Sequence, residues 1–248
     1  MKTVRIGVWN VQADRRTRER TRRIRARLAS LDADLLCLNE AFPFDVPGEH
    51  ESARVITSGL SDWRPEAKGA RKIVLWSRAG WDEIDSEGSP LLPEGRFVSG
   101  QLRLEDRGVR VLGIAPPYHA YRTSERWSAR RRRVWQGSEE YWQALAVDVL
   151  PHVCAPALIA GDFNVQFPPI RYPPAHSDVF RLSETALSGW AVATAGIPVD
   201  GRNLDKPLVC HVAHTPDVEV LDCSVLSRFD DDGLELSDHP CICLTLLL

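Results

Sequence analysis

Short apolar runs recur along the whole chain of 248 residues and alternate with segments of helical periodicity. Runs of this kind, rich in valine, isoleucine and leucine, are typical of buried strands. The predicted strands are 3–9, 35–38, 55–56, 73–76, 97–104, 109–115, 157–160, 209–212, 218–226 and 241–247, and the predicted helices are 15–31 and 124–149. The alternation predicts an α/β fold with many strands and few helices.

No linker, repeat or low-complexity block divides the chain, so we predict one domain over residues 1–248. The order of the runs favours two packed mixed β-sheets flanked by helices. Hydrophobic residues make up 44% of the chain and charged residues 26%, which argues against disorder. No run approaches the roughly 18 apolar residues of a membrane span, and the first residues do not resemble a signal peptide. We therefore expect a cytoplasmic monomer without stable membrane association.

Basic residues are unevenly distributed, although the net charge is only −3. Of the 31 basic residues 27 are arginine, with eight between Arg15 and Arg27 and six between Arg122 and Arg133. Such clusters can steer an anionic substrate toward a site. The first cluster is also explained by a solvated helix face, and we favour that explanation for it.

Isolated polar residues stand where the predicted strands end. They are Asn10, Asn39 and Glu40, the Tyr118–His119 pair, Asp162 and Asn164, and the Asp238–His239 pair. Strand ends from distant parts of one domain can converge at the rim of a sheet pair. Carboxylate and amide oxygens suit a hard cation such as Mg²⁺, with Mn²⁺ as the alternative. With imidazoles that stabilise developing charge, the set suits hydrolysis of a phosphoester.

Asp222 stands inside an apolar strand rather than at its end. An unpaired carboxylate buried there would cost several kcal/mol. We therefore expect Asp222 to pair with a cation or an imidazole, and His239 is the candidate.

Six cysteines are present, and four lie inside apolar, strand-like runs, as expected of free thiols in a reducing compartment. The spacing of Cys210, His211, His214 and Cys223 matches no standard zinc pattern, so no zinc site is expected from it.

Five short motifs in order resemble the endonuclease/exonuclease/phosphatase superfamily, which includes deoxyribonuclease, AP endonuclease, sphingomyelinase and inositol-phosphatase branches. The motifs are Trp9-Asn10-Val11, Leu38-Asn39-Glu40, Gly161-Asp162-Phe163-Asn164, Leu221-Asp222 and Ser237-Asp238-His239-Pro240. Each is short, but together they span nearly the whole chain. The resemblance implies a four-layer α/β sandwich with its site at the rim of two sheets.

The resemblance also implies a role for each matching residue. Glu40 resembles the metal-binding glutamate, with Asn10 near the metal and Asp238 linked to the metal or to water. Asp162 resembles the aspartate that orients or deprotonates the attacking water, and Asn164 its phosphate-contacting partner. His239 resembles the histidine on the scissile phosphate, held by Asp222.

Two positions depart from the family patterns. Either Tyr118 or His119 could contact phosphate, and we favour His119. Gln12 stands where AP endonucleases often have an aspartate, which weakens the case for that branch and for a tightly held second metal.

Three classes of function compete. A nuclease that cleaves DNA or RNA is favoured by the second arginine cluster, with Arg122 and Arg126 as candidate substrate-binding residues beside Tyr118. The alternative is a phosphodiesterase or phosphatase for a small soluble or lipid-derived ester. A catalytically inactive binding module is the third class, and the full polar set argues against it.

Overall fold

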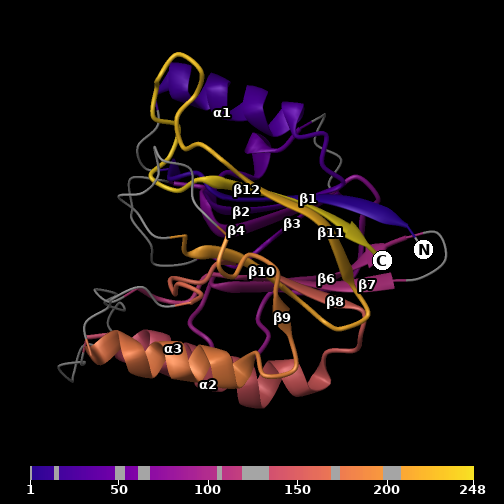
Figure 1. Ribbon diagram of the computed structural model, residues 1–248, viewed down its shortest axis with the longest axis vertical. Helices are drawn as coiled ribbons and strands as arrows, with labels where there is room; N and C mark the ends of the chain where they lie inside the picture. The colour runs from indigo at the N-terminus through magenta and orange to yellow at the C-terminus, as the bar shows by residue number, and fades with distance from the viewer. Residues whose placement is uncertain are drawn as a thin grey trace.

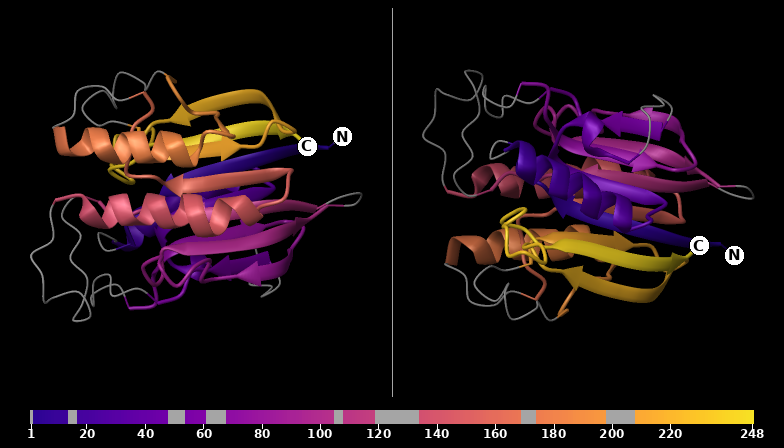
Figure 2. Two further views of the ribbon diagram at one scale, coloured as in Figure 1. Left: turned by 90° about the horizontal axis from the view of Figure 1, so that it is seen from below. Right: turned by 90° about the horizontal axis from the view of Figure 1, so that it is seen from above.

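The computed structural model describes residues 2–13, 17–47, 54–60, 68–104, 108–118, 134–168, 174–197 and 208–248. Two six-stranded sheets pack face to face, with α1 on the outer face of one and α2 and α3 on the outer face of the other (Figure 1). Figure 2 shows the sandwich from its two outer faces, with α2 and α3 lying across the strands in the view from below and α1 lying across them in the view from above. The predicted four-layer sandwich of two mixed sheets is confirmed.

The first sheet has the strand order β11-β12-β1-β2-β4-β3 and the second the order β5-β6-β7-β8-β10-β9. The strands are β1 (Thr3–Asn10), β2 (Leu35–Ala41), β3 (Val55–Thr57), β4 (Arg71–Ser77), β5 (Trp81–Asp85), β6 (Phe97–Arg103), β7 (Gly108–Ile114), β8 (Ala157–Asp162), β9 (Ala191–Val192), β10 (Cys210–His214), β11 (Glu219–Leu226) and β12 (Cys241–Leu247). The helices are α1 (Arg18–Ser30), α2 (Gln136–Ala144) and α3 (Pro174–Ala186), with short turns η2 (Pro43–Asp45), η6 (Leu145–Val149) and η7 (Leu150–His152).

Each sheet is built around one parallel pair, β1 with β2 in the first and β7 with β8 in the second. The other pairings within the sheets are antiparallel. The parallel pairs place four carboxyl ends at one rim of the sandwich. The antiparallel neighbours β4, β10 and β12 bring their amino ends to the same rim.

Three groups of buried apolar residues fill the three interfaces between the layers. Val8, Leu75 and Val111 belong to the group between the sheets. Trp142 and Phe163 belong to the group beneath α2 and α3, and a third group lies beneath α1. Because apolar side chains cover both faces of both sheets, the strands read as nearly continuous apolar runs.

The structure departs from the sequence predictions in its short and peripheral elements. Strands β5 and β9 and helix α3 were not predicted. Helix α1 begins later than predicted, where Thr17 caps it by accepting a hydrogen bond from the backbone N–H of Arg20. Of the predicted helix 124–149, residues 124–133 lie outside the described part of the chain. The described part is helical from Gln136, because α2 (Gln136–Ala144) continues as the π-helical turn η6 to the predicted end at Val149. Among the described residues, no helix has the length and apolar character to cross a membrane.

Candidate active site at the rim of the two sheets

Asp162 is held at the rim by one group from each sheet. It ends β8, and its Oδ2 accepts a hydrogen bond of 3.0 Å from Nδ2 of Asn10, which ends β1 in the other sheet. Its Oδ1 accepts a second hydrogen bond of 3.1 Å from the backbone N–H of Asn164. Both Asp162 and Asn10 are buried. The two strand ends that the sequence marked as polar therefore meet, and they fix the direction of one carboxylate.

The backbone leaves its usual range at three positions of this rim. Gln12, Glu40 and Asn164 have φ angles of 46°, 51° and 52°, in the left-handed region that glycine favours. Asn164 is further held by a hydrogen bond of 2.8 Å from its Nδ2 to the carbonyl of Pro116. Such strained residues cluster at functional sites and persist only where surrounding contacts enforce them.

Gly161 lets β8 approach β7 closely just before Asp162. Its φ is +141°, and a Cβ at this position would overlap the carbonyl oxygen of Ile114. A side chain would therefore push apart the two strands of the parallel pair and move Asp162.

Glu40 has a partner that sequence reasoning missed. Nζ of Lys72, at the start of β4, lies 2.7 Å from Oε1 of Glu40, and the Lys72 side chain is only 4% exposed. Burial lowers the pKa of Lys72 to about 8, although Glu40 beside it acts in the opposite direction. A lysine just before an apolar run is typical of an exposed strand end, so the sequence alone does not predict the contact of Lys72 with Glu40.

The loop before β12 carries the predicted Asp238 and His239 and is tied to the end of β1. Ser237 donates a hydrogen bond of 2.5 Å to the carbonyl of Asn10, and the indole N–H of Trp9 donates one of 2.9 Å to the carbonyl of His239. Oε1 of Gln12 accepts a hydrogen bond of 3.1 Å from the backbone N–H of Asp238. The Gln12 side chain, which departs from the family pattern, thus positions this loop.

His239 faces two groups in the described part of the chain. Its Nδ1 lies 3.5 Å from Sγ of the buried Cys210, and its Nε2 lies 3.4 Å from Oδ1 of Asp238. Burial, and next to it the negative charge of Asp162, raises the pKa of the Cys210 thiol well above its usual range. Sequence reasoning missed Cys210, because a cysteine in a β-rich run is typical of a plain buried residue.

The expectation that Asp222 is buried and pairs with His239 is wrong. Asp222 is exposed in the edge strand β11, opposite Thr245 in the middle of β12, whereas His239 precedes β12. A bulge between Val220 and Asp222 breaks the alternation of the strand. Val220 and Cys223 pack against the core instead, so the carboxylate reaches water and needs no buried partner.

Three of the predicted substrate contacts, His119, Arg122 and Arg126, lie outside the described residues. Tyr118 is the last described residue before that segment and is 41% exposed.

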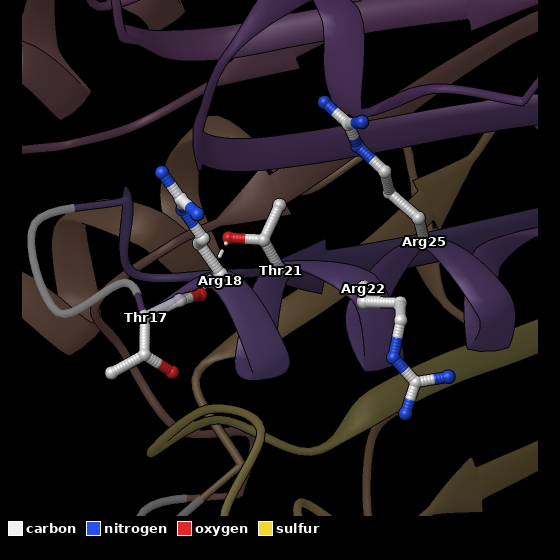
Figure 3. A pocket seen from close by; sticks show the side chains of 5 residues that line it. All are labelled: Thr17, Arg18, Thr21, Arg22 and Arg25. Atoms are coloured by element: carbon white, nitrogen blue, oxygen red, sulfur yellow. Dashed lines mark hydrogen bonds between the residues drawn. The ribbon is translucent and has the colours of Figure 1, made fainter.

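The arginines of α1 divide into two faces. Arg20 is buried and donates a hydrogen bond of 2.7 Å to the carbonyl of Leu236, while Arg23 and Arg27 bind the loop 227–232. Arg18, Arg22 and Arg25 instead line a surface hollow together with Thr17 and Thr21 (Figure 3). Part of the first arginine cluster therefore ties α1 to the loop 227–232. The part that lines the hollow is partly compensated, since Arg22 pairs with Glu19 and Arg25 lies 3.8 Å from Asp45.

Residues 7–239 match the model of the Endonuclease/Exonuclease/phosphatase family, so the chain belongs to this family. An endonuclease/exonuclease/phosphatase from Bacteroides vulgatus is 15% identical, with a TM-score of 0.68 over 100% of both chains. TDP2 from D. rerio, complexed with single-strand DNA product, is 14% identical, with a TM-score of 0.65 over 100% of both chains. The 3′ phosphatase NExo from Neisseria, bound to product DNA hairpin, is 18% identical, with a TM-score of 0.65 over 97% of this chain and 98% of that one. Among curated proteins, sequence comparison finds no match.

Proposed function

We propose that this protein is a divalent-metal-dependent phosphodiesterase of nuclease type that cleaves DNA or RNA by in-line attack of water. The observation that carries the proposal is the pairing of Asp162 with Asn10 across the two sheets. It sets a fixed carboxylate at the rim to which Glu40, Asn164, Asp238 and His239 also belong. Membership of the Endonuclease/Exonuclease/phosphatase family supports the same chemistry.

The donors around Glu40 fit a hard cation. The predicted ligands Asn10, Glu40 and Asp238 offer only oxygen atoms, as Mg²⁺ and Mn²⁺ prefer. Next to Glu40, Oδ1 of Asn39 is buried and has no hydrogen-bond partner among the described residues, so this end of β2 holds an acceptor that a cation or water would satisfy. Gln12 is already bound to Asp238 and Arg20, which favours one cation over two.

A cation held by Glu40, Asn10 and Asp238 would stabilise negative charge on a non-bridging phosphate oxygen. The residues of the chain perform the remaining tasks. Asp162, fixed by Asn10 and Asn164, accepts a hydrogen bond from the attacking water and aligns it with phosphorus. His239 and the amide of Asn164 stabilise the charge that develops on the phosphoryl oxygens.

Two observations favour a polynucleotide over a small ester. Structures of similar fold hold DNA products, namely TDP2 with single-strand DNA and NExo with a DNA hairpin. Arg18, Arg22 and Arg25 line a hollow on α1, where Arg22 also pairs with Glu19 and Arg25 lies 3.8 Å from Asp45. Buried Arg20 joins this helix to Gln12 at the rim. Arginines placed in this way can neutralise backbone phosphates away from the scissile bond.

The test is a Mg²⁺ and Mn²⁺ assay on plasmid DNA, single-stranded DNA, RNA and bis-p-nitrophenyl phosphate. Glu40→Gln and Asp162→Asn are expected to lower turnover of a polynucleotide by about 10² to 10³-fold. Glu219→Gln and Asp217→Asn are matched controls, because these exposed carboxylates lie at the far ends of the strands. Hydrolysis of the small ester alone would support the small-substrate alternative, and no hydrolysis with either metal would contradict the proposal.

A further inference from the structure

Three side chains with different donor atoms converge at the rim, and two of them, Asp162 and His239, are proposed catalytic groups. A carboxylate oxygen of Asp162, Sγ of Cys210 and a ring nitrogen of His239 all lie within 4.8 Å of one another. Cys210 stands directly opposite Asp162 in the pairing of β10 with β8, and His239 lies in the loop that leads into β12 of the other sheet. The backbone of the sandwich therefore sets their separation.

The chemistry of this cluster differs from that around Glu40. Thiolate, imidazole and carboxylate are the ligands that Zn²⁺ prefers, and three protein ligands with an open fourth position are typical of an accessible zinc site. Tetrahedral zinc, with bonds of roughly 2.3 Å to sulfur and 2.0 Å to nitrogen, separates these two atoms by about 3.5 Å. The observed distance between Sγ of Cys210 and Nδ1 of His239 is 3.5 Å.

The carboxylate is also oriented in advance. Asn10 and the backbone of Asn164 each donate one hydrogen bond to Asp162, and each carboxylate oxygen keeps a further lone pair for a metal. Hydrogen bonds of this kind orient metal-binding side chains in many proteins, and here they fix the direction of the Asp162 carboxylate.

We propose that Asp162, Cys210 and His239 form a second metal site, which binds Zn²⁺ and is distinct from the oxygen-only site at Glu40. On binding, the Cys210 thiol loses its proton to solvent and its sulfur bonds to the metal, so one proton is released for each zinc ion. Zinc in this position occupies Asp162 and His239 and inhibits hydrolysis. The inhibition depends on the proposed phosphodiesterase function, whereas the binding does not.

Cobalt(II) is the probe for binding, because a thiolate ligand gives cobalt an intense charge-transfer band in the near ultraviolet. The full chain, kept reduced with a phosphine, is titrated with Co²⁺. The band is expected to saturate at a single equivalent and to disappear when Zn²⁺ is added. It should be absent from Cys210→Ser and unchanged in Cys154→Ser, which removes an exposed free thiol. A wild-type protein without the band, or a band that survives in Cys210→Ser, would overturn the proposal.

Asp162→Asn provides a second test, because it keeps the thiol and removes a charged ligand. It should weaken Co²⁺ binding by at least about tenfold, and unchanged affinity would exclude Asp162 as a ligand. Circular dichroism checks that each variant is folded. If Cys210→Ser does not fold, the Co²⁺ affinity of Asp162→Asn tests the site in its place.

Zinc inhibition separates this proposal from the proposed function. In the Mg²⁺-supported assay, Zn²⁺ should inhibit the wild-type chain, and the half-inhibitory concentration should rise at least about tenfold in Cys210→Ser, relative to that variant's own activity. If the protein hydrolyses no phosphoester but shows the cobalt band, the proposed function is contradicted and the metal site is supported. If it hydrolyses DNA but shows no band, the metal site is contradicted and the proposed function is supported.

Discussion

The ammonium of Lys72 lies 2.7 Å from the carboxylate of Glu40, and only 4% of the Lys72 side chain is exposed. The positive charge of Lys72 thus lies next to Glu40, the residue that the family resemblance assigns to metal binding. Burial lowers the pKa of Lys72 to about 8, so its amine is still protonated in most molecules at pH 7. Lys72 and a cation at Glu40 repel each other.

Lys72→Met is therefore expected to tighten Mg²⁺ binding. Unit charges about 4 Å apart interact by about 4 kcal/mol at an effective dielectric constant near 20. A tenfold change in affinity corresponds to about 1.4 kcal/mol, so the Mg²⁺ affinity is expected to rise by at least about tenfold. Isothermal titration calorimetry with Mg²⁺ at pH 7 measures it directly. Lys68→Met removes an exposed lysine and serves as the control. Weaker or unchanged binding would mean that Lys72 only supports the shape of the site.

A second prediction concerns Gly161, which positions Asp162. Gly161→Ala is expected to destabilise the protein by about 3 kcal/mol or more, since the new methyl group overlaps the carbonyl of Ile114 and φ is +141°. Urea denaturation followed by circular dichroism measures the loss. Gly189→Ala is the control, because nothing lies within 4 Å of a Cβ there. Equal midpoints for the two variants would contradict the close approach of β7 and β8.

The strands were predictable from the sequence, and so was the polar character of the strand ends that meet at Asn10 and Asp162. Buried strands need apolar side chains on both faces, so Asn10 and Asp162 at strand ends are polar exceptions with a positional meaning. The same pattern could not find Lys72 or Cys210, because the contacts that give them meaning join segments far apart in the chain. Helix α3 was missed because it begins at Pro174, at the end of a proline-rich stretch, and its polar residues resemble a loop.

His211 makes stability depend on pH in a defined window. Burial lowers its pKa to about 4 from the ordinary value of 6.5. The neutral ring is satisfied, since Nε2 donates to the carbonyl of Val165 and Nδ1 accepts from the hydroxyl of Thr194. Between pH 4 and 6.5 the unfolded chain therefore binds more protons than the folded one, so the free energy of unfolding rises with pH across this window.

The contribution of His211 is complete above pH 6.5 and is lost as the pH falls toward 4. A shift of this size corresponds to about 3 kcal/mol. Urea unfolding at a series of pH values should show this slope in the wild-type chain and a shallower one in His211→Gln, whatever the stability of that variant at pH 7. Parallel curves for the two proteins would show that His211 does not titrate as its burial implies.

His239 has one partner according to the family resemblance and other partners in the structure. The resemblance assigns the orientation of His239 to Asp222, but Asp222 is exposed in the middle of the edge strand β11, and His239 instead faces Cys210 and Asp238. If that geometry governs catalysis, Asp222→Asn keeps turnover within about twofold of wild type, as expected for an exposed side chain away from the reacting groups. His239→Asn should lose about 10² to 10³-fold under the same conditions. Steady-state kinetics on the best polynucleotide substrate measures both. Comparable losses in the two variants would mean that β11 rearranges when substrate binds and returns Asp222 to the imidazole.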